Sequence, residues 1–159
     1  MVKIPIILRL KKEGYRKIAL AQDVMVEELY KIFDNAVLHG GTAIWRCYNG
    51  NRFSEDVDVY IDKNPSKINT FFENLKKKDF TILKKKISDR SIFSNLELGN
   101  TIIRFEAVFK EIKGILKEYE TAEGNLITVR TLPLEEIVKE KIKAYLKRVK
   151  VRDIYDIFF

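Results

Sequence analysis

The stretch 38-LHGGTAIWRCYNGNRFSEDVDVYI-61 decides how the rest of the chain is arranged. Near its end, Asp56 and Asp58 alternate with three apolar residues. This alternation predicts a β-strand with one buried face, on which both carboxylates point to the same side. Two carboxylates held side by side repel each other unless a cation lies between them, and Mg²⁺ is usually held by one or two carboxylates together with substrate phosphates. The pair therefore predicts a magnesium site.

A pair of glycines, Gly40 and Gly41, lies upstream of this strand and directly follows a short apolar run. We expect a strand over 36–39 and a helix over 42–48. Glycines at a strand-to-helix turn allow backbone N–H groups to approach a phosphate, and the N-terminus of the helix favours negative charge. A phosphate-binding turn followed by a metal-binding carboxylate pair indicates phosphoryl or nucleotidyl transfer.

The length and composition are those of an ordinary globular protein. With 159 residues the chain has the usual size of one domain and can bury a substantial core. Its 30 basic and 23 acidic residues give a formal charge of +7. That excess either favours a polyanionic partner such as nucleic acid or a nucleotide, or is a lysine-rich solvated surface.

The compartment is also indicated by composition. Cys47 is the one cysteine, which excludes an internal disulfide and fits a reducing cytoplasm. The opening ten residues are too short and too interrupted for a membrane span or a signal peptide. We therefore expect a cytoplasmic protein with no membrane partner.

Apolar spacing along the chain predicts the remaining elements. Helices are expected over 15–33, 65–78, 134–145 and 149–159. Strands are expected over 80–83, 92–98, 101–109 and 126–129. A run at 4–8 could form a further strand although Pro5 disfavours it, and residues 110–125 are expected to form a loop or an irregular connection. The order predicts an α/β (α+β) fold with a small mixed sheet flanked by helices, in one domain with a sheet-containing core (1–130) and a helical C-terminal segment (131–159).

The strand predicted over 101–109 carries a charged residue among apolar neighbours. Glu106 in this setting normally needs a partner or a metal. Arg104 points to the same side of the strand and could be that partner. Because the aspartate pair is already present, we prefer Glu106 as a third metal-binding carboxylate. Glu97, on the preceding strand, is a rival for that role.

His39 is the one histidine of the chain. It could contact a phosphate or a base, but we favour the simpler interpretation, in which it ends the first strand beside Gly40. A lone histidine without a cysteine or a second histidine gives no zinc site. The expected chemistry therefore depends on the carboxylates.

Two separated motifs resemble one known family. Residues 40–43 (GGTA) followed by 52–58 (RFSEDVD) resemble the signature of the DNA polymerase β-like nucleotidyltransferase superfamily, in the form of its AbiEii/AbiGii toxin branch. Residues 141–148 (KIKAYLKR) followed by 152–156 (RDIYD) resemble the second signature of that branch. Alone, the second motif would be a charged amphipathic helix with ion pairs. Two motifs in the right order are far more specific than an Asp-x-Asp pattern.

The resemblance implies a nucleotide-binding site. Gly40, Gly41 and Thr42 match the turn that holds the nucleoside triphosphate. Arg52 and Ser54 match further signature positions, where their role is either nucleotide binding or structural. The segment after the second motif is shorter than in many relatives, which leaves acceptor recognition open and fits a shortened form of the family.

The resemblance also implies a catalytic set. Asp56 and Asp58 match the metal-binding pair, and Glu106 is assigned as a third metal ligand from the superfamily pattern. Lys141 matches the lysine that contacts the nucleotide phosphates. Asp153 matches an acid near that lysine, which either orients it or acts on the acceptor. Two Mg²⁺ ions, with Mn²⁺ as the alternative, would be the cofactors.

The function implied by the resemblance is a Mg-dependent nucleotidyltransferase. It would move a nucleoside monophosphate from an NTP to an acceptor hydroxyl at an RNA 3′ end, such as that of tRNA, as the toxin of a pair with a cognate antitoxin protein. Three alternatives stay open: nucleotidylation of a protein or small molecule, a catalytically idle nucleotide-binding module, and a plain RNA-binding α/β domain. Dependence on RNA separates the implied function from nucleotidylation of a protein or small molecule. Release of pyrophosphate separates it from an idle nucleotide-binding module, and dependence on Mg²⁺ separates it from a plain RNA-binding domain.

Overall fold

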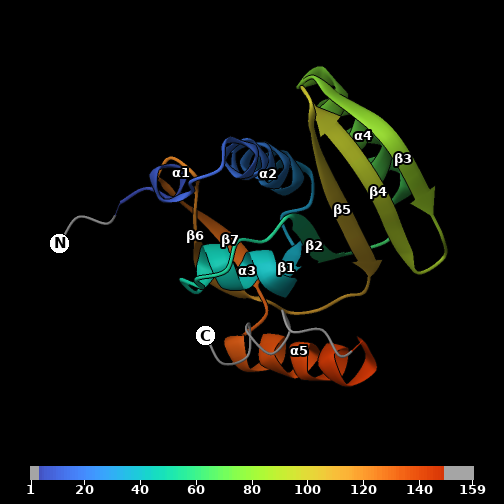
Figure 1. The fold of residues 1–159 in the computed structure, drawn as a ribbon. Coiled ribbons are helices and arrows are strands. Elements are labelled where there is room, and N and C mark those ends of the chain that lie inside the picture. Colours follow the sequence, from blue (N-terminus) through green and yellow to red (C-terminus); the bar gives the residue numbers. More distant parts are fainter. Residues whose placement is uncertain (1–3, 149–159) are drawn as a thin grey trace.

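The computed structural model describes residues 4–148 of the chain (Figure 1). Its helices are α1 (Ile6–Arg9), α2 (Glu13–Ile32), α3 (Gly40–Cys47), α4 (Pro65–Lys77) and α5 (Leu134–Arg148). Its strands are β1 (Val37–His39), β2 (Asp56–Ile61), β3 (Phe80–Ile87), β4 (Ser91–Leu98), β5 (Thr101–Phe109), β6 (Ile115–Glu120) and β7 (Leu126–Thr131). The strands form one mixed sheet in the order β3-β4-β5-β2-β1-β7-β6. The predicted α/β class, with a mixed sheet flanked by helices, is confirmed.

The register of the central strands brings the predicted site residues together. β2 pairs in parallel with β5, so that Asp56 lies beside Arg104 and Asp58 beside Glu106. On its other edge β2 pairs antiparallel with β1, and His39 lies opposite Asp58. Paired residues of neighbouring strands point to the same face of a sheet. These five side chains therefore share one face.

The opposite face of the same strands carries the hydrophobic core. Val57 and Val59 of β2 and Phe105 and Ala107 of β5 are buried there. Helices α2 and α4 cover this face (Figure 1). Phe71 of α4 packs against Phe105 with the ring centroids 5.0 Å apart. The alternation predicted for β2 and β5 is confirmed, because burial of every second residue leaves the polar residues on the other face.

The prediction of a strand over 4–8 is wrong. Pro5 instead precedes α1, a single helical turn. Proline has no N–H for a sheet ladder, and its fixed φ angle suits the start of a helix. Ile6 is buried, and the N–H of Ile7 donates to the carbonyl of Ala122 at 2.9 Å. This segment therefore packs against the loop after β6.

The two edges of the sheet also differ from the expectation. Residues 110–125 contain the regular strand β6, which pairs antiparallel with β7. At the other edge, β3 continues beyond Leu83 through three lysines to Ile87. Edge strands tolerate charged side chains because much of their surface faces water. Their sequences consequently lack the apolar pattern that identifies a strand.

The other predicted elements are confirmed with boundaries shifted by a few residues. Asn64 caps α4 as its side-chain oxygen accepts from the N–H of Lys67 at 3.1 Å, and Pro65 occupies the first turn. The predicted helix over 149–159 lies outside the described residues. Within the described residues, no helix combines the length and the apolar character that crossing a membrane requires.

A buried ion pair ties α3 to α2 and β6. Arg46 Nη1 lies 2.8 Å from Asp23 Oδ1, and the Arg46 side chain is 0% exposed. Arg46 also donates to the carbonyl of Glu120 at 3.0 Å. Asp23 accepts from the Tyr119 hydroxyl at 3.0 Å and from the N–H of Ala122 at 2.7 Å. This network fixes the position of α3, the helix that begins at the glycine pair.

Candidate active site

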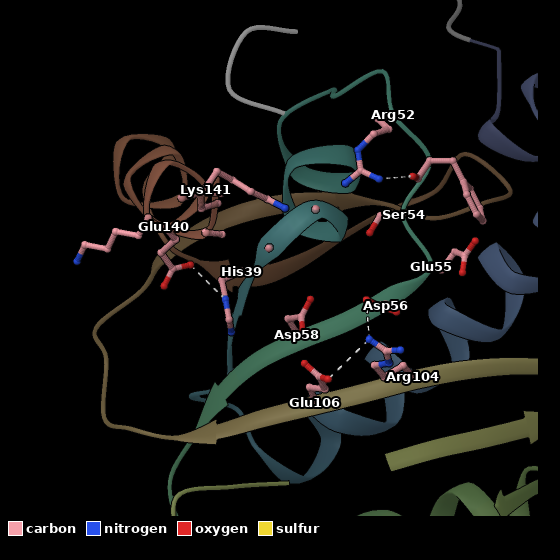
Figure 2. Close-up of a pocket in the computed structure, with 16 residues that line it drawn as sticks. His39, Arg52, Ser54, Glu55, Asp56, Asp58, Arg104, Glu106, Glu140 and Lys141 are labelled. Atoms are coloured by element: carbon pink, nitrogen blue, oxygen red, sulfur yellow. Dashed lines mark hydrogen bonds and ion pairs between the residues drawn. The ribbon is translucent and has the colours of Figure 1, made fainter. Parts of the chain in front are cut away.

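A cavity of about 690 Å³ opens on the polar face of β2 and β5 (Figure 2). Its walls come from the start of α3, the segment before β2, the strands β2 and β5, and the helix α5. Most of the predicted site residues line it: Gly40, Gly41, Arg52, Ser54, Asp56, Asp58, Glu106 and Lys141. Residues that are 100 positions apart in sequence thus meet in one recess. Asp153 lies outside the described residues.

The two glycines are required by close approach of side chains to the turn. Gly40 has a φ angle of +76°, and a Cβ atom there would lie 2.8 Å from Asp58 Oδ2. A Cβ atom on Gly41 would lie 2.8 Å from Arg52 Nη2 and 2.9 Å from Ser54 Oγ. Helix α3 begins at Gly40, two residues before the predicted start. The first turn of α3, where backbone N–H groups lack intrahelical partners, is therefore at the cavity wall.

Replacing Gly41 with alanine is expected to weaken nucleotide binding. The added methyl group comes too close to both the Arg52 guanidinium and the Ser54 hydroxyl, so that both must shift. We expect the Kd for an NTP to rise about tenfold or more, which corresponds to about 1.4 kcal/mol, in a calorimetric titration. Gly14→Ala is the matched control, because a Cβ atom on Gly14 meets nothing within 4 Å. Equal affinities of the two variants would contradict a role for the turn in nucleotide binding.

Thr42 is fully buried beneath the cavity. Its hydroxyl donates to the backbone carbonyl of Asp56 and shares a hydrogen bond of 3.0 Å with the Ser54 hydroxyl. Gln22 Nε2 donates to the carbonyl of Ser54 at 2.8 Å. The Thr42 side chain therefore positions the start of β2. Ser54 lines the cavity and is held there from both sides.

The negative charges of the carboxylates on β2 and β5 repel one another within the cavity. The pKa of Asp58 is raised to about 7, chiefly by burial and also by the negative charges of Asp56 and Glu106, although His39 acts in the opposite direction. Arg104 Nη1 lies 3.8 Å from Asp56 Oδ2 and 3.9 Å from Glu106 Oε1. The ion pair between Arg104 and Glu106 that the sequence allowed is thus present, although it is long. The recess favours a cation.

The donor set fits a hard divalent cation in its chemistry. Asp56, Asp58 and Glu106 supply carboxylate oxygens, the ligands that Mg²⁺ prefers. Within the described part of the chain, however, no three acidic, histidine or cysteine side chains are arranged to hold a metal ion. Arg104 lies near two of the three carboxylates, and its side chain is 47% exposed, so it has room to move away. Glu97 pairs with Ile102 and does not line the cavity, whereas Glu106 does.

The sequence did not predict the contact that holds α5 over the cavity. His39 Nδ1 lies 3.2 Å from Glu140 Oε1, and the His39 ring stacks on Tyr60 with centroids 4.0 Å apart. The Tyr60 hydroxyl donates to the other oxygen of Glu140. Although burial raises the pKa of Glu140, the hydrogen bonds from His39 and Tyr60 hold it below its usual value. Glu140 thereby anchors α5 to β1 and β2 and places the adjacent Lys141 at the cavity.

His39 therefore does more than end a strand. It lines the cavity together with Arg104 and Glu140, none of which was predicted as a site residue. One signal in the sequence could have identified Glu140. Together with Lys141 it shares a helix face with Ile137 and Ala144, which also line the cavity, at spacings of three and four.

Comparisons with known proteins identify the family and the fold of the chain. The family model described as "Nucleotidyl transferase AbiEii toxin, Type IV TA system" matches residues 23–159. The nucleotidyltransferase toxin MenT4 from Mycobacterium tuberculosis H37Rv superposes with a TM-score of 0.72 at 19% identity, over 95% of this chain and 60% of that one. JHP933 from Helicobacter pylori gives 0.66 at 20% identity, over 92% of this chain and 65% of that one. No curated protein matches the sequence.

A putative nucleotidyltransferase from Helicobacter pylori is a further similar structure, with a TM-score of 0.65 at 21% identity, over 91% of this chain and 67% of that one. At such identities the likeness establishes a shared fold. The chain spans between 60% and 67% of the length of these three structures.

Proposed function

Because the chain belongs to the AbiEii nucleotidyltransferase toxin family, we propose that it transfers a nucleoside monophosphate from an NTP to the 3′ hydroxyl of an RNA, with tRNA as the acceptor class. We further propose that it acts in the cytoplasm as the toxin of a pair with an antitoxin protein. One observation carries the proposal. The carboxylates of Asp56, Asp58 and Glu106 face the same cavity as the glycine turn and Lys141.

The triphosphate fits the side of the cavity between α3 and α5. Gly40 and Gly41 supply the turn at the start of α3, and Figure 2 shows Lys141 extending from α5 toward α3. Arg52 adds a second cation on that wall. Positive charge and helix N–H groups stabilise the negative charge that develops on a departing pyrophosphate. We place the β and γ phosphates there.

The acceptor hydroxyl fits the side of the cavity near β5. Asp56, Asp58 and Glu106 would hold Mg²⁺, which when bound neutralises phosphate charge and lowers the pKa of the acceptor hydroxyl. The acceptor oxygen forms a bond to the α-phosphorus while the bond to the bridging oxygen breaks and pyrophosphate leaves. The hydroxyl proton passes to solvent. This reaction needs no side-chain nucleophile, in keeping with the buried position of Cys47, whose pKa burial raises to about 12.

Labelling of RNA tests the proposal. Purified protein is incubated with Mg²⁺, total tRNA and each labelled NTP in turn, beside an Asp58→Ala variant. We expect label on RNA with the intact protein and none with the variant, because the variant lacks the central carboxylate. The labelled nucleotide then identifies the preferred base.

Two other outcomes would contradict an RNA acceptor. Label on the protein itself, or on an added protein, would favour nucleotidylation of proteins. Binding of an NTP with no release of pyrophosphate would favour an idle nucleotide-binding module.

Transfer that persists undiminished in chelator would contradict the assignment of the carboxylates as metal ligands.

A further inference from the structure

We propose that the acceptor RNA docks as a single strand on the face of β3, β4 and β5 that lies on the same side as the cavity. We call this surface the acceptor face and define it by Lys84, Lys86, Phe93 and Arg104. The lysines would contact backbone phosphates, and Phe93 would stack on a base near the 3′ end. This inference rests on the proposed function and extends it to the site of the acceptor.

Strand register places the acceptor face beside the catalytic carboxylates. Phe93 of β4 lies between Glu106 of β5 and Lys86 of β3. Two residues farther along, Arg104 and Lys84 flank β4 in the same way. Paired residues share a face, so all of these side chains are on the same side of the sheet. The acceptor face is therefore continuous with the cavity, and Arg104 belongs to both.

The described residues leave the acceptor face open to solvent. Figure 1 shows α4 packed on the other side of β3, β4 and β5. Helix α5 instead contributes residues to the wall of the cavity. Lys84 and Lys86 are exposed. Ile102 and Val108 of β5, which point to the same face, are 54% and 38% exposed. A strand of nucleic acid thus has access to basic and apolar groups together.

Phe93 has the surroundings of a base-stacking platform. Lys84 Nζ lies 5.3 Å and the guanidinium carbon of Arg104 lies 5.5 Å from the centroid of its ring. Aromatic rings beside cations bind single-stranded nucleic acid because bases stack on the ring while the cations track the phosphates. A row of lysines alone would be an ordinary solvated surface. The half-buried ring between two cations distinguishes this face from the lysines of α4.

The geometry of the reaction sets the direction of entry. In-line transfer requires the acceptor oxygen to approach opposite the departing pyrophosphate. The wall formed by α3 and α5 is occupied by the triphosphate in the proposed function. The acceptor must therefore come from the opposite side, where Glu106 and Arg104 open onto Phe93. Glu97, on the same face, lies toward the β4–β5 turn, which agrees with a strand that passes over the lysine-bearing part of β3.

Charge reversal at the acceptor face tests the inference. We expect Lys84→Glu/Lys86→Glu to raise the KM for tRNA about tenfold or more, because two phosphate contacts are lost. For the same reason, the slope of log KM against log salt concentration should decrease by about one to two. The KM for the NTP should stay within about twofold, since both lysines are remote from α3 and α5. Phe93→Ala should raise the KM for tRNA about fivefold or more through loss of stacking.

The matched control is Lys77→Glu/Lys85→Glu. Lys85 lies between the two test lysines, but it pairs with the buried Ser94 and its Nζ lies 4.9 Å from the ring centroid of Phe72 on α4, so it points to the other face. Lys77 is exposed on α4. The control changes the net charge by the same amount and should leave the KM for tRNA within about twofold. An equal loss in both double variants, or an unchanged KM in the test variant, would overturn the proposal.

The remaining outcomes are also decisive. If the intact protein labels no RNA, the proposed function fails. If the intact protein labels RNA and the test variant has the same KM for tRNA, only the proposed docking site is wrong. If the test variant instead loses binding to an antitoxin or changes its oligomeric state while RNA labelling is unchanged, the face is a protein interface and the inference is wrong. Lys84→Ala/Lys86→Ala gives a milder second test should charge reversal unfold the edge strand.

Discussion

Asp58→Asn is expected to lower the rate of nucleotidyl transfer by at least about 10²–10³-fold, the usual effect of removing one group that stabilises charge in a transition state. Asparagine keeps the shape of the side chain but not its charge. It therefore weakens the carboxylate set of Asp56, Asp58 and Glu106 without a steric change. Activity is measured as label transferred per enzyme at saturating NTP and RNA. Full activity would contradict the site.

The same substitution is expected to stabilise the metal-free fold at pH 8. In the native protein the pKa of Asp58 is raised from 3.8 to about 7, chiefly by burial. The native state therefore holds more protons than the unfolded state between these values, and the free energy of unfolding falls as the pH rises through this window. At pH 8 the ionised Asp58 costs about 2 kcal/mol or more. Asparagine has no such cost.

Urea unfolding at pH 5 and pH 8 in chelator measures this effect. The intact protein should lose stability between the two pH values, and Asp58→Asn should lose less. Asp34→Asn, at an exposed position, is the control and should follow the intact protein. Added Mg²⁺ should raise the melting temperature of the intact protein at pH 8 but not that of Asp58→Asn, if the carboxylates hold the ion. A pH dependence that is identical in all three proteins would contradict the assigned environment of Asp58.

Arg46→Met is expected to lower the free energy of unfolding by about 3–5 kcal/mol, the usual cost of removing one partner of a buried ion pair. Methionine fills part of the volume but leaves Asp23 buried with only the donors Tyr119 and Ala122 among those described above. Burial already raises the pKa of Asp23 against the lowering effect of Arg46. A domain of this size has about 5–15 kcal/mol of stability in total. The loss is therefore a large fraction of it.

Urea unfolding of Arg46→Met measures the loss, and a second substitution tests its cause. Asp23→Asn in the same background removes the unpaired charge and should recover part of the stability. Lowering the pH from 7 to 5 should also stabilise Arg46→Met relative to the intact protein, because Asp23 then binds a proton more readily when folded. Arg90→Met, at an exposed turn position, should change stability by about 0.5 kcal/mol or less. A similarly small effect of Arg46→Met would show that the pair is not needed.

Local sequence patterns determined the central elements of this protein. The period of two in 56–61 and 101–109 fixed which side chains of β2 and β5 face the core. Asn64 and Pro65 fixed the start of α4, and Gly99 with Asn100 fixed the turn between β4 and β5. These features depend on backbone preferences and on burial within a few residues. They can be recognised without knowing which other element is adjacent.

The strand-to-helix pattern identified the glycine turn and the resemblance to a family identified Lys141, and the structure brings both to one cavity. The sequence prediction missed the edge strand β6 and ended the edge strand β3 too early, for a physical reason. β6 and the end of β3 have much of their surface in water, so their charged residues give no apolar alternation. Pairing with a neighbouring strand stabilises them, and in β6 side-chain burial is confined to Tyr119 and Glu120 at its end.

What only the tertiary structure decided is which distant side chains become neighbours. The sequence alone placed Asp58 and Glu106 on strand faces, but their adjacency depends on the parallel register of β2 with β5. His39 and Glu140 are 101 positions apart, and a charge on a helix surface usually faces water, so no local pattern could join them. Arg46 and Asp23 become partners for the same reason, through the packing of α3 on α2. A strand or helix period fixes the direction of a side chain, whereas pairing and packing of whole elements fix what it meets.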